Sequence, residues 1–160
     1  MSLDWLKSSE RETALFALAD RFGIPVSAFD GYALYKKGDH ISAVRSEAVE
    51  ADALLHAQEG GIPLLKTGKG GVSKPATAGI LVFGVHATKA VADLSSNDLK
   101  GLAEGRSLPA GEGKGYVIVR VDGVVAGMAL LRDGRMVGQI PKWVTENLKM
   151  SGRESFATEG

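Results

Sequence analysis

Residues 115–148 read GYVIVRVDGVVAGMALLRDGRMVGQIPKWVTENL, and this stretch decides the fold of the second half of the chain. It contains two Asp-Gly pairs, at 122–123 and 133–134, and such pairs tolerate the positive φ angles of two-residue hairpin turns. Three segments rich in β-branched and other apolar side chains flank these pairs: residues 116–121, 124–131 and 135–140. The pattern predicts an antiparallel meander of three strands, which can bury one face.

The residues after the third segment predict a change from strand to helix. Pro141 lacks an amide proton and therefore ends the ladder of hydrogen bonds. Trp143, Val144 and Leu148 then begin a short amphipathic helix that we expect to lie across the sheet. In this interpretation Trp143 is largely buried against the meander.

Composition restricts the class of protein. The 160 residues are enough for one ordinary domain or two small ones. Apolar residues make up 44% and charged residues 24%, with a net charge of zero, so the composition excludes intrinsic disorder. There is no cysteine, and hence no disulfide or thiolate–metal site. No apolar run reaches the roughly 18 residues of a membrane span and no signal-peptide core is present, so we expect a cytoplasmic protein without a membrane partner.

The zero net charge hides an asymmetry along the chain. Residues 1–60 contain 6 basic and 10 acidic side chains, whereas residues 61–160 contain 13 basic and 9 acidic ones. A polyanionic partner is therefore expected to meet the second part of the chain.

The first half of the chain alternates helix and strand signals. Ser9 and Glu12 have the spacing of a capping box, and Gly23 is a helix stop. Lys37-Gly38-Asp39 has the composition of a hairpin turn. The predicted elements are a helix over 9–22, a hairpin of residues 32–35 and 41–44, a helix over 48–58 and a strand over 62–65.

A second set of signals leads into the meander. Pro75 suits the first turn of a helix, and residues 76–86 are apolar on nearly all sides, so we expect this helix to be buried. The elements that follow are a strand at 90–92, a helix over 96–104 capped by Ser95 and ended by Gly105, and a flexible approach at 110–115.

A glycine-rich segment, TGKGGVSK, occupies residues 67–74. Glycine-rich backbone amides that precede a helix bind anions, so contact with a nucleic-acid backbone is one interpretation. The spacing of a P-loop, Gly and four residues before Gly-Lys-Ser/Thr, is not present. A mobile glycine loop is the other interpretation.

Residues suited to catalysis are few and scattered. His40, His56 and His86 fall in different predicted elements and have no metal-ligand spacing. Ser73 and Ser107 lack the Gly-x-Ser-x-Gly elbow, and no pair of carboxylates lies in apolar surroundings. We therefore expect a binding module with no enzymatic activity, no metal and no cofactor.

Three segments follow one another in the order KPATAGILVFG, VADLSSNDLKGLAEGRSLP and GYVIVRVDGVVAGMALLRDGRMVGQIPKW. In this order they resemble the C-terminal, PUA-like RNA-binding region of Sun-type rRNA cytosine methyltransferases. The shared pattern is an apolar helix, a strand before an Asp-Leu-Ser cap, a helix ending at glycine, and a meander of the form Gly-aromatic-Val-x-Val-x-x-Asp-Gly with a terminal Pro-Lys. The matching positions, within residues 60–148, are Asp93, Leu94, Ser95, Gly105, Gly115, Tyr116, Val117, Val119, Asp122, Gly123, Gly127, Pro141 and Lys142.

The layout is also similar to small ribosome-biogenesis proteins that place an α/β pre-PUA domain before a PUA domain. The resemblance implies an α+β fold in which a pre-PUA-like α/β unit, residues 1–88, packs on a PUA-like mixed β-barrel, residues 89–160. One departure is Val137-Gly138-Gln139, where the methyltransferase pattern carries a basic and an amide residue, and it weakens direct RNA contact there. Without a catalytic cysteine or room for a Rossmann domain, the chain is expected to be a free-standing RNA-binding module or a fragment of something larger.

The resemblance and the charge pattern together predict a non-catalytic protein that binds structured rRNA or tRNA in ribosome biogenesis or RNA modification. A ribosome-biogenesis protein or an RNA-modifying enzyme is a further expected partner. The predicted RNA contacts are Lys66, Lys69, Lys74, Lys114, Arg120, Arg132, Arg135 and Lys142. The alternative is a protein-interaction module or accessory subunit without RNA contact, with an apolar patch formed by Met128, Met136, Trp143 and Met150.

Overall fold

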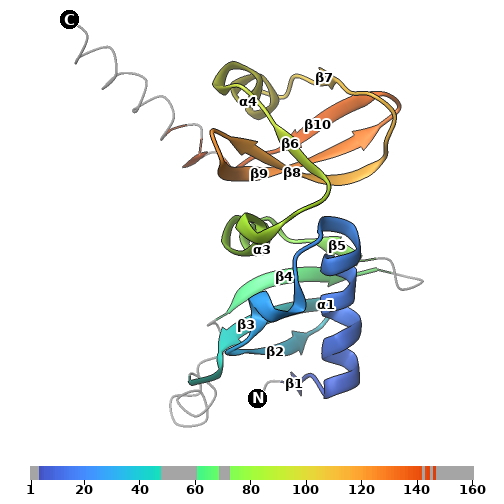
Figure 1. The fold of residues 1–160 in the computed structure, drawn as a ribbon, viewed down its shortest axis with the longest axis vertical. Helices are drawn as coiled ribbons and strands as arrows, with labels where there is room; N and C mark the ends of the chain where they lie inside the picture. The colour runs from blue at the N-terminus through green and yellow to red at the C-terminus, as the bar shows by residue number, and fades with distance from the viewer. Residues whose placement is uncertain (1–3, 48–60, 69–72, 142, 145, 147–160) are drawn as a thin grey trace, which may run out of the picture. The chain divides into compact units, whose positions relative to one another are not determined.

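The computed structural model describes residues 4–47, 61–68, 73–141, 143, 144 and 146. The chain separates into two compact units, Met1–Ala90 and Val91–Gly160, and each contains a five-stranded sheet (Figure 1). The division predicted from the sequence lay between residues 88 and 89. The protein is therefore α+β. Among the described residues, no helix is both long and apolar enough to cross a membrane.

The first unit is an antiparallel sheet with helices packed on it. Its strands lie side by side in the order of the sequence, and they are β1 (Asp4–Trp5), β2 (Tyr32–Lys37), β3 (His40–Arg45), β4 (Ile62–Thr67) and β5 (Ser73–Pro75). The helices are α1 (Ser8–Phe22) and α3 (Thr77–Phe83), with short 3₁₀ helices η1 (Val26–Phe29) and η3 (Gly84–His86). The helix predicted over 48–58 lies outside the described residues.

Helix α1 ends where the sequence predicts but begins earlier. Gly23 adopts a φ of 64°, which is the left-handed conformation of a helix stop. At the other end, the helix starts at Ser8, and the Glu10 carboxylate accepts a hydrogen bond from the backbone N–H of Lys7 (3.2 Å). The capping box predicted two residues later is therefore wrong. Apolar side chains at helical spacing face the core, namely Leu15, Leu18 and Phe22.

The hairpin of β2 and β3 confirms the predicted turn. Lys37 pairs with His40 across a two-residue turn, and Gly38 has a φ of 61° at the first central position, as a type II′ turn requires. Strand β4 continues the sheet, with a shift of register between Ile41 and Ser42 of β3. This strand is longer than predicted, because it extends to Thr67.

Residues 67–74, predicted as a loop, belong in part to a second hairpin. Thr67 of β4 pairs with Ser73 of β5, and Lys66 pairs with Lys74. Pro75 is the last residue of β5 and is buried, so its predicted place in the first turn of a helix is wrong. The described ends of the glycine-rich segment are thus held by strand pairing.

Helix α3 is buried on one side only. Gly79, Ile80 and Phe83 of α3 are buried, whereas Val82 of α3 is 44% exposed and Val85 of the following η3 is 61% exposed. The expectation of a helix buried all round is therefore wrong. A helix that packs on a single sheet buries only the face that touches the sheet. Its other face stays exposed, even where that face is apolar.

The second unit is a curled, mixed sheet on which a helix packs. Its strands lie in the order β6-β8-β9-β10-β7, with β6 parallel to β8 and the other pairs antiparallel. They are β6 (Val91–Asp93), β7 (Leu108–Pro109), β8 (Gly115–Val121), β9 (Val124–Arg132) and β10 (Arg135–Gln139), and the helix is α4 (Ser96–Ala103). The sequence did not predict β7. Figure 1 shows α4 close to β7, with which it is in contact.

The predicted meander is confirmed, and its turns have the expected geometry. Asp122 and Gly123 have φ angles of 52° and 79°, and Asp133 and Gly134 have 54° and 73°. Positive φ at both central residues is the signature of the type I′ turn, which matches the twist of the flanking strands. The sequence therefore sets the pairing of β8, β9 and β10 locally.

Helix α4 packs against the meander. The Ser95 hydroxyl accepts a hydrogen bond from the Asp98 backbone N–H (3.1 Å), which confirms the predicted N-cap. Leu99 and Leu102 are buried, and α4 contacts β7, β8 and β10. At Gly138 of β10 the helix comes so close that a Cβ would lie 2.7 Å from the Leu102 Cβ and 3.1 Å from its carbonyl oxygen.

The expected burial of Trp143 is wrong, because its side chain is 54% exposed. Trp143 and Val144 are helical, as predicted, and they follow Pro141 at the end of the meander. The meander is covered in part by α4, which contacts β8 and β10 and brings Leu102 close to Gly138.

Candidate nucleic-acid interface

The structure describes six of the eight predicted RNA-contact residues and separates them into three places. Lys66 and Lys74 lie in the first unit. In the second unit, Lys114, Arg132 and Arg135 lie at one end of the sheet and Arg120 lies toward the other end of β8. Lys69 and Lys142 lie outside the described residues.

In the first unit, a row of basic side chains crosses four strands. Lys37 pairs with His40, His40 with Lys66, and Lys66 with Lys74. Directly opposed residues of antiparallel strands project to the same side of the sheet, so these four side chains share one face. We call them the lysine row, and all four are exposed. The row spans three strand spacings, about 14 Å.

The pleat of the sheet separates the lysine row from the core. The neighbouring paired residues Ile41, Leu65 and Pro75 project to the opposite side and are buried. The row is therefore anchored on strands whose other face is packed, and its backbone geometry is fixed.

The carboxylate of Asp39 lies beside the lysine row. The Asp39 side chain is 3.3 Å from His40 Nε2 and 3.9 Å from Lys66 Nζ. The three side chains are each at least half exposed, at 50% for Asp39, 57% for His40 and 53% for Lys66. Water screens such contacts, so Asp39 offsets only part of the repulsion within the row.

In the second unit, two arginines face each other at the turn between β9 and β10. Arg132 pairs directly with Arg135 across the type I′ turn. The Arg135 guanidinium donates hydrogen bonds to the Ser107 hydroxyl from Nε (3.0 Å) and Nη2 (2.8 Å) and to the Ser107 carbonyl (2.9 Å). Arg132 is 75% exposed, and its Nε lies 4.0 Å from the Asp133 carboxylate. One guanidinium is thus oriented by the fold, while the other projects into solvent.

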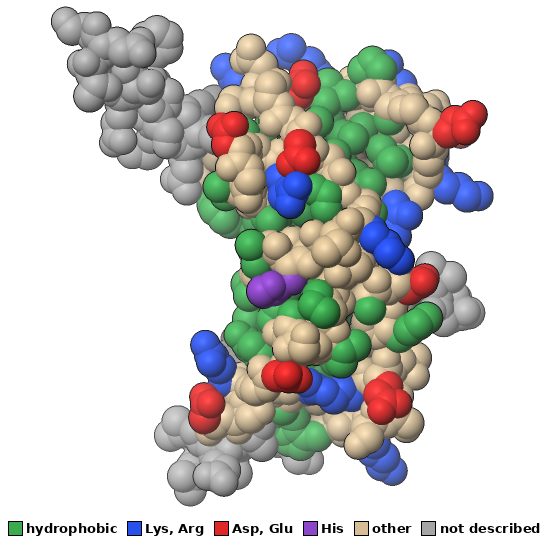
Figure 2. All heavy atoms as spheres, in the orientation of Figure 1, with side chains coloured by type: hydrophobic (Ala, Val, Ile, Leu, Met, Phe, Trp, Pro, Cys, Tyr) green, Lys and Arg blue, Asp and Glu red, His purple; other side chains and the backbone are tan. Residues whose placement is uncertain are grey.

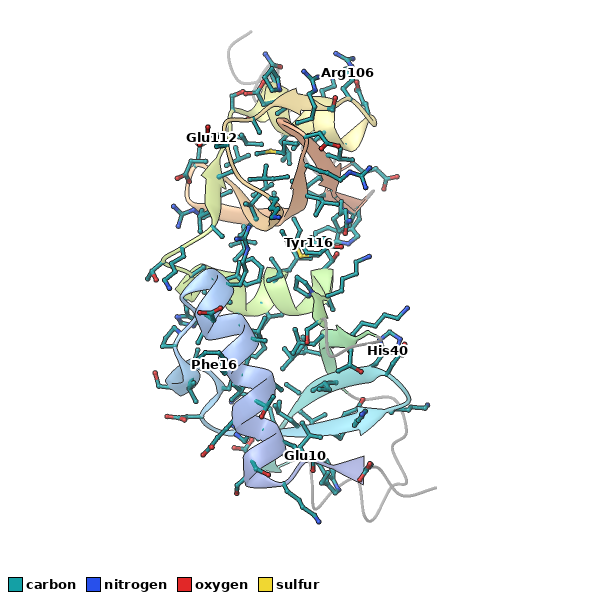
Figure 3. All side chains as sticks on the ribbon, turned by 90° about the vertical axis from the view of Figure 1, so that its right-hand side faces the viewer. Glu10, Phe16, His40, Arg106, Glu112 and Tyr116 are labelled. Carbon is teal, nitrogen blue, oxygen red and sulfur yellow. The ribbon has the colours of Figure 1, made fainter. Side chains whose placement is uncertain are left out.

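Further cations lie near this pair. Lys114 is exposed and directly precedes Gly115, which pairs with Leu131 beside Arg132. Arg106, which precedes Ser107, is 73% exposed and forms a 2.8 Å ion pair with Glu104. Figure 3 labels Arg106 among other nitrogen-tipped side chains of this unit. We call Arg106, Lys114, Arg132 and Arg135 the arginine end.

Arg120 has a different environment. Its Nε and Nη2 donate hydrogen bonds of 3.0 and 3.1 Å to the two carboxylate oxygens of Asp93, which joins β8 to β6. This side-chain hydrogen bond lowers the pKa of Asp93 below its ordinary value and raises the pKa of Arg120. Arg120 lies six residues, about 20 Å of extended strand, from Lys114. It therefore holds two strands together and is separated from the arginine end.

Total charge does not single out either unit. Met1–Ala90 contains 10 basic and 10 acidic residues, and Val91–Gly160 contains 9 of each. On the face that Figure 2 shows, side chains of both signs are interspersed in each unit. The basic excess after residue 60 comes from residues 61–90, which have four lysines and no acidic residue. Net charge therefore identifies no site, and the two candidate clusters are recognised by strand pairing.

Sequence reasoning missed Lys37, His40, Arg106 and Ser107. The two-residue turn at Gly38 was a sufficient signal that Lys37 and His40 are paired. The pairing of His40 with Lys66 had no such signal, because it joins strands separated by many residues. Ser107 was considered only as a nucleophile, and its contact with Arg135 depends on the pairing of β7 with β10.

The apolar patch of the alternative interpretation does not form as predicted. Met128 and Met136 are 1% and 8% exposed, so they belong to the core of the second unit. Trp143 is exposed, and Met150 lies outside the described residues. Among the residues that the structure describes, no group of three or more His, Cys, Asp or Glu side chains is arranged to hold a metal ion.

Comparison with known proteins adds no assignment. No protein-family model matches this sequence, and no curated protein is significantly similar to it.

Proposed function

We propose that this protein is a non-catalytic RNA-binding protein that contacts structured rRNA or tRNA in the cytoplasm, in ribosome biogenesis or RNA modification. In this proposal the second unit is PUA-like and the first is pre-PUA-like. Support for this identity comes from the order of a short strand, a Ser-capped helix and a meander with two Asp-Gly turns, which is the order that the sequence resemblance implies.

The arginine end carries the proposal. Arg132 and Arg135 are held directly opposite each other, although like charges in that position destabilise a sheet. Both partners are exposed, so the cluster contributes nothing to a core. A phosphate between the two guanidinium groups would relieve the repulsion, because it accepts hydrogen bonds from both.

The hydrogen bonds from Arg135 to Ser107 fix the orientation of one guanidinium in this cluster. Nε and Nη2 are directed at Ser107, so the remaining N–H groups of the guanidinium have a defined direction. A preoriented side chain loses less conformational entropy on binding than a free one. Ser107 is therefore a positioning residue in this proposal.

Filter binding of the full chain to tRNA and to rRNA fragments, between about 50 and 200 mM salt, tests the proposal. Replacing both Arg132 and Arg135 by Gln should weaken binding and reduce the magnitude of the salt slope by about two, one unit for each lost phosphate contact. Lys100→Gln is the control, because this exposed lysine lies on α4 rather than at the arginine end. Equal binding by the wild type, the Arg132/Arg135 double variant and the Lys100→Gln variant would refute the proposal.

Ser107→Ala separates charge from orientation. It leaves both arginines in place but removes the hydroxyl that accepts from Arg135. We expect a weaker affinity with an unchanged salt slope, because the number of phosphate contacts remains the same. Crosslinking in cells, followed by sequencing of the bound RNA, would identify the RNA; recovery of a protein partner and no RNA would favour the protein-interaction alternative.

A further inference from the structure

We propose that the lysine row of the first unit binds the sugar–phosphate backbone of duplex RNA without reading its bases. This inference rests on the proposed RNA-binding function and assigns it a second contact surface, distinct from the arginine end. Two members of the row, Lys37 and His40, come from a hairpin that the charge pattern of the sequence did not implicate.

Register is the first argument for this surface. Lys66 and Lys74 are directly opposed on neighbouring strands, and His40 is directly opposed to Lys66 on its other side. Lys66 and Lys74 carry like charges in directly opposed positions, a pairing that does not favour the sheet. A polyanion lying across the strands would offset this repulsion, because its phosphates attract both ammonium groups.

The dimensions of the row suit a nucleic-acid backbone. A nucleic-acid duplex carries a phosphate on every nucleotide of each strand, so a row of about 14 Å can meet more than one phosphate. The row is nearly straight, because each member is the cross-strand neighbour of the next. Figure 3 shows His40 at the end of its strand.

The two tyrosines on the four strands of the row lie outside the row itself, and this favours duplex over single-stranded RNA. Proteins that bind single strands stack bases on exposed aromatic rings. The four strands of the row contain two aromatic residues, both described: Tyr35 is buried, and Tyr32 packs against Phe83 at the opposite end of β2. Lysines reach phosphates as point charges and carry no base-reading geometry, so recognition should not depend on sequence.

Substitution of Asp39 tests whether phosphates bind at the lysine row, because its carboxylate is a negative charge beside this basic surface. If phosphates bind there, the Asp39 carboxylate repels them, and Asp39→Asn should tighten binding a few-fold. If the row is only a solvated surface, this substitution should not change RNA binding. The backbone carbonyl of Asp39, which accepts hydrogen bonds from Thr67 N–H and Oγ1, is retained in Asn.

The main experiment measures binding of the full chain to a perfectly paired RNA duplex of about 20 base pairs and arbitrary sequence, over a salt series. Replacing Lys66 and Lys74 by Gln should raise Kd on the order of tenfold at low salt and reduce the magnitude of the salt slope by about two. Lys37→Gln should act in the same direction. Lys36→Gln is the matched control, because its neighbouring position pairs with Ile41 and projects to the other side of the sheet.

Urea midpoints of all variants test folding. If the Lys66/Lys74 double variant binds like wild type while the Arg132/Arg135 double variant binds weakly, this inference fails and the proposed function stands. If both double variants bind like wild type, both fail. If the double lysine variant loses affinity for a single strand but not for the duplex, the assignment to duplex RNA is overturned.

Discussion

Gly79→Ala should destabilise the first unit, although alanine is the better helix former. Gly79 lies in α3, and a Cβ built there would be 2.6 Å from the Pro63 carbonyl oxygen and 3.1 Å from the Leu64 Cα of β4. Both are backbone atoms, so no side-chain rotation relieves the contact. Ordinary contact begins at 3.4 Å, so the helix has to move away from the strand by up to about 0.8 Å.

The magnitude follows from two opposing effects. Overpacking a tightly packed contact costs about 1–3 kcal/mol. Replacing glycine by alanine inside a helix returns up to about 1 kcal/mol. The net change expected for Gly79→Ala is a loss of about 1–2 kcal/mol in the free energy of unfolding. With a slope near 1–3 kcal/mol/M, the urea midpoint should fall by roughly 0.3–2 M.

The assay is urea unfolding followed by tryptophan fluorescence. Trp143→Phe leaves Trp5 as the remaining tryptophan, and Trp5 contacts Tyr35 of the first unit edge to face at 5.8 Å. Gly101→Ala is the matched control in α4, since a Cβ there meets no described atom within 4 Å; followed by circular dichroism, it should stabilise or be neutral. A midpoint for Gly79→Ala equal to or above that of the parent would refute the close approach of α3 to β4.

The ion pair of the second unit makes stability depend on pH. Because Arg120 lowers the pKa of folded Asp93, the stabilisation is complete above the ordinary Asp pKa of about 3.9 and is lost as pH falls through the folded value. Asp93→Asn should therefore lower the urea midpoint at pH 7, and the difference from wild type should shrink below about pH 4; a constant difference would contradict the ion pair. Trp143 is 54% exposed, so Trp143→Ala should change the free energy of unfolding by no more than about 0.5 kcal/mol. A loss near 3 kcal/mol, typical of a buried aromatic side chain, would show that Trp143 is part of a core.

The elements that the sequence predicted correctly depend on short-range chemistry. The two Asp-Gly pairs require positive φ, and a two-residue turn pairs the residues that flank it, so the meander follows from residues 115–140 alone. Ser95 caps α4 through a contact three residues away. In each case the information and the structure lie within a few residues of each other.

Two of the predictions that failed, for Trp143 and for α3, concern what covers an apolar surface. Trp143 and most residues of α3 are apolar, but an apolar side chain does not reveal which other side chain will pack against it. In the folded protein Leu102 occupies the place against Gly138, and only the Ile80 and Phe83 side of α3 meets the core. These outcomes depend on packing between segments far apart in the sequence, and local periodicity gives no information about such packing.

The candidate site divides in the same way. From the sequence alone, basic residues near the Asp133-Gly134 turn and in residues 66–74 could be named as candidates, because their types and local turns are visible there. Only the tertiary structure decided that Arg120 is bound to Asp93, that Ser107 orients Arg135, and that His40 stands opposite Lys66. Each of these contacts joins residues more than 20 positions apart, and strand register, which brings such residues together, is a property of the whole sheet.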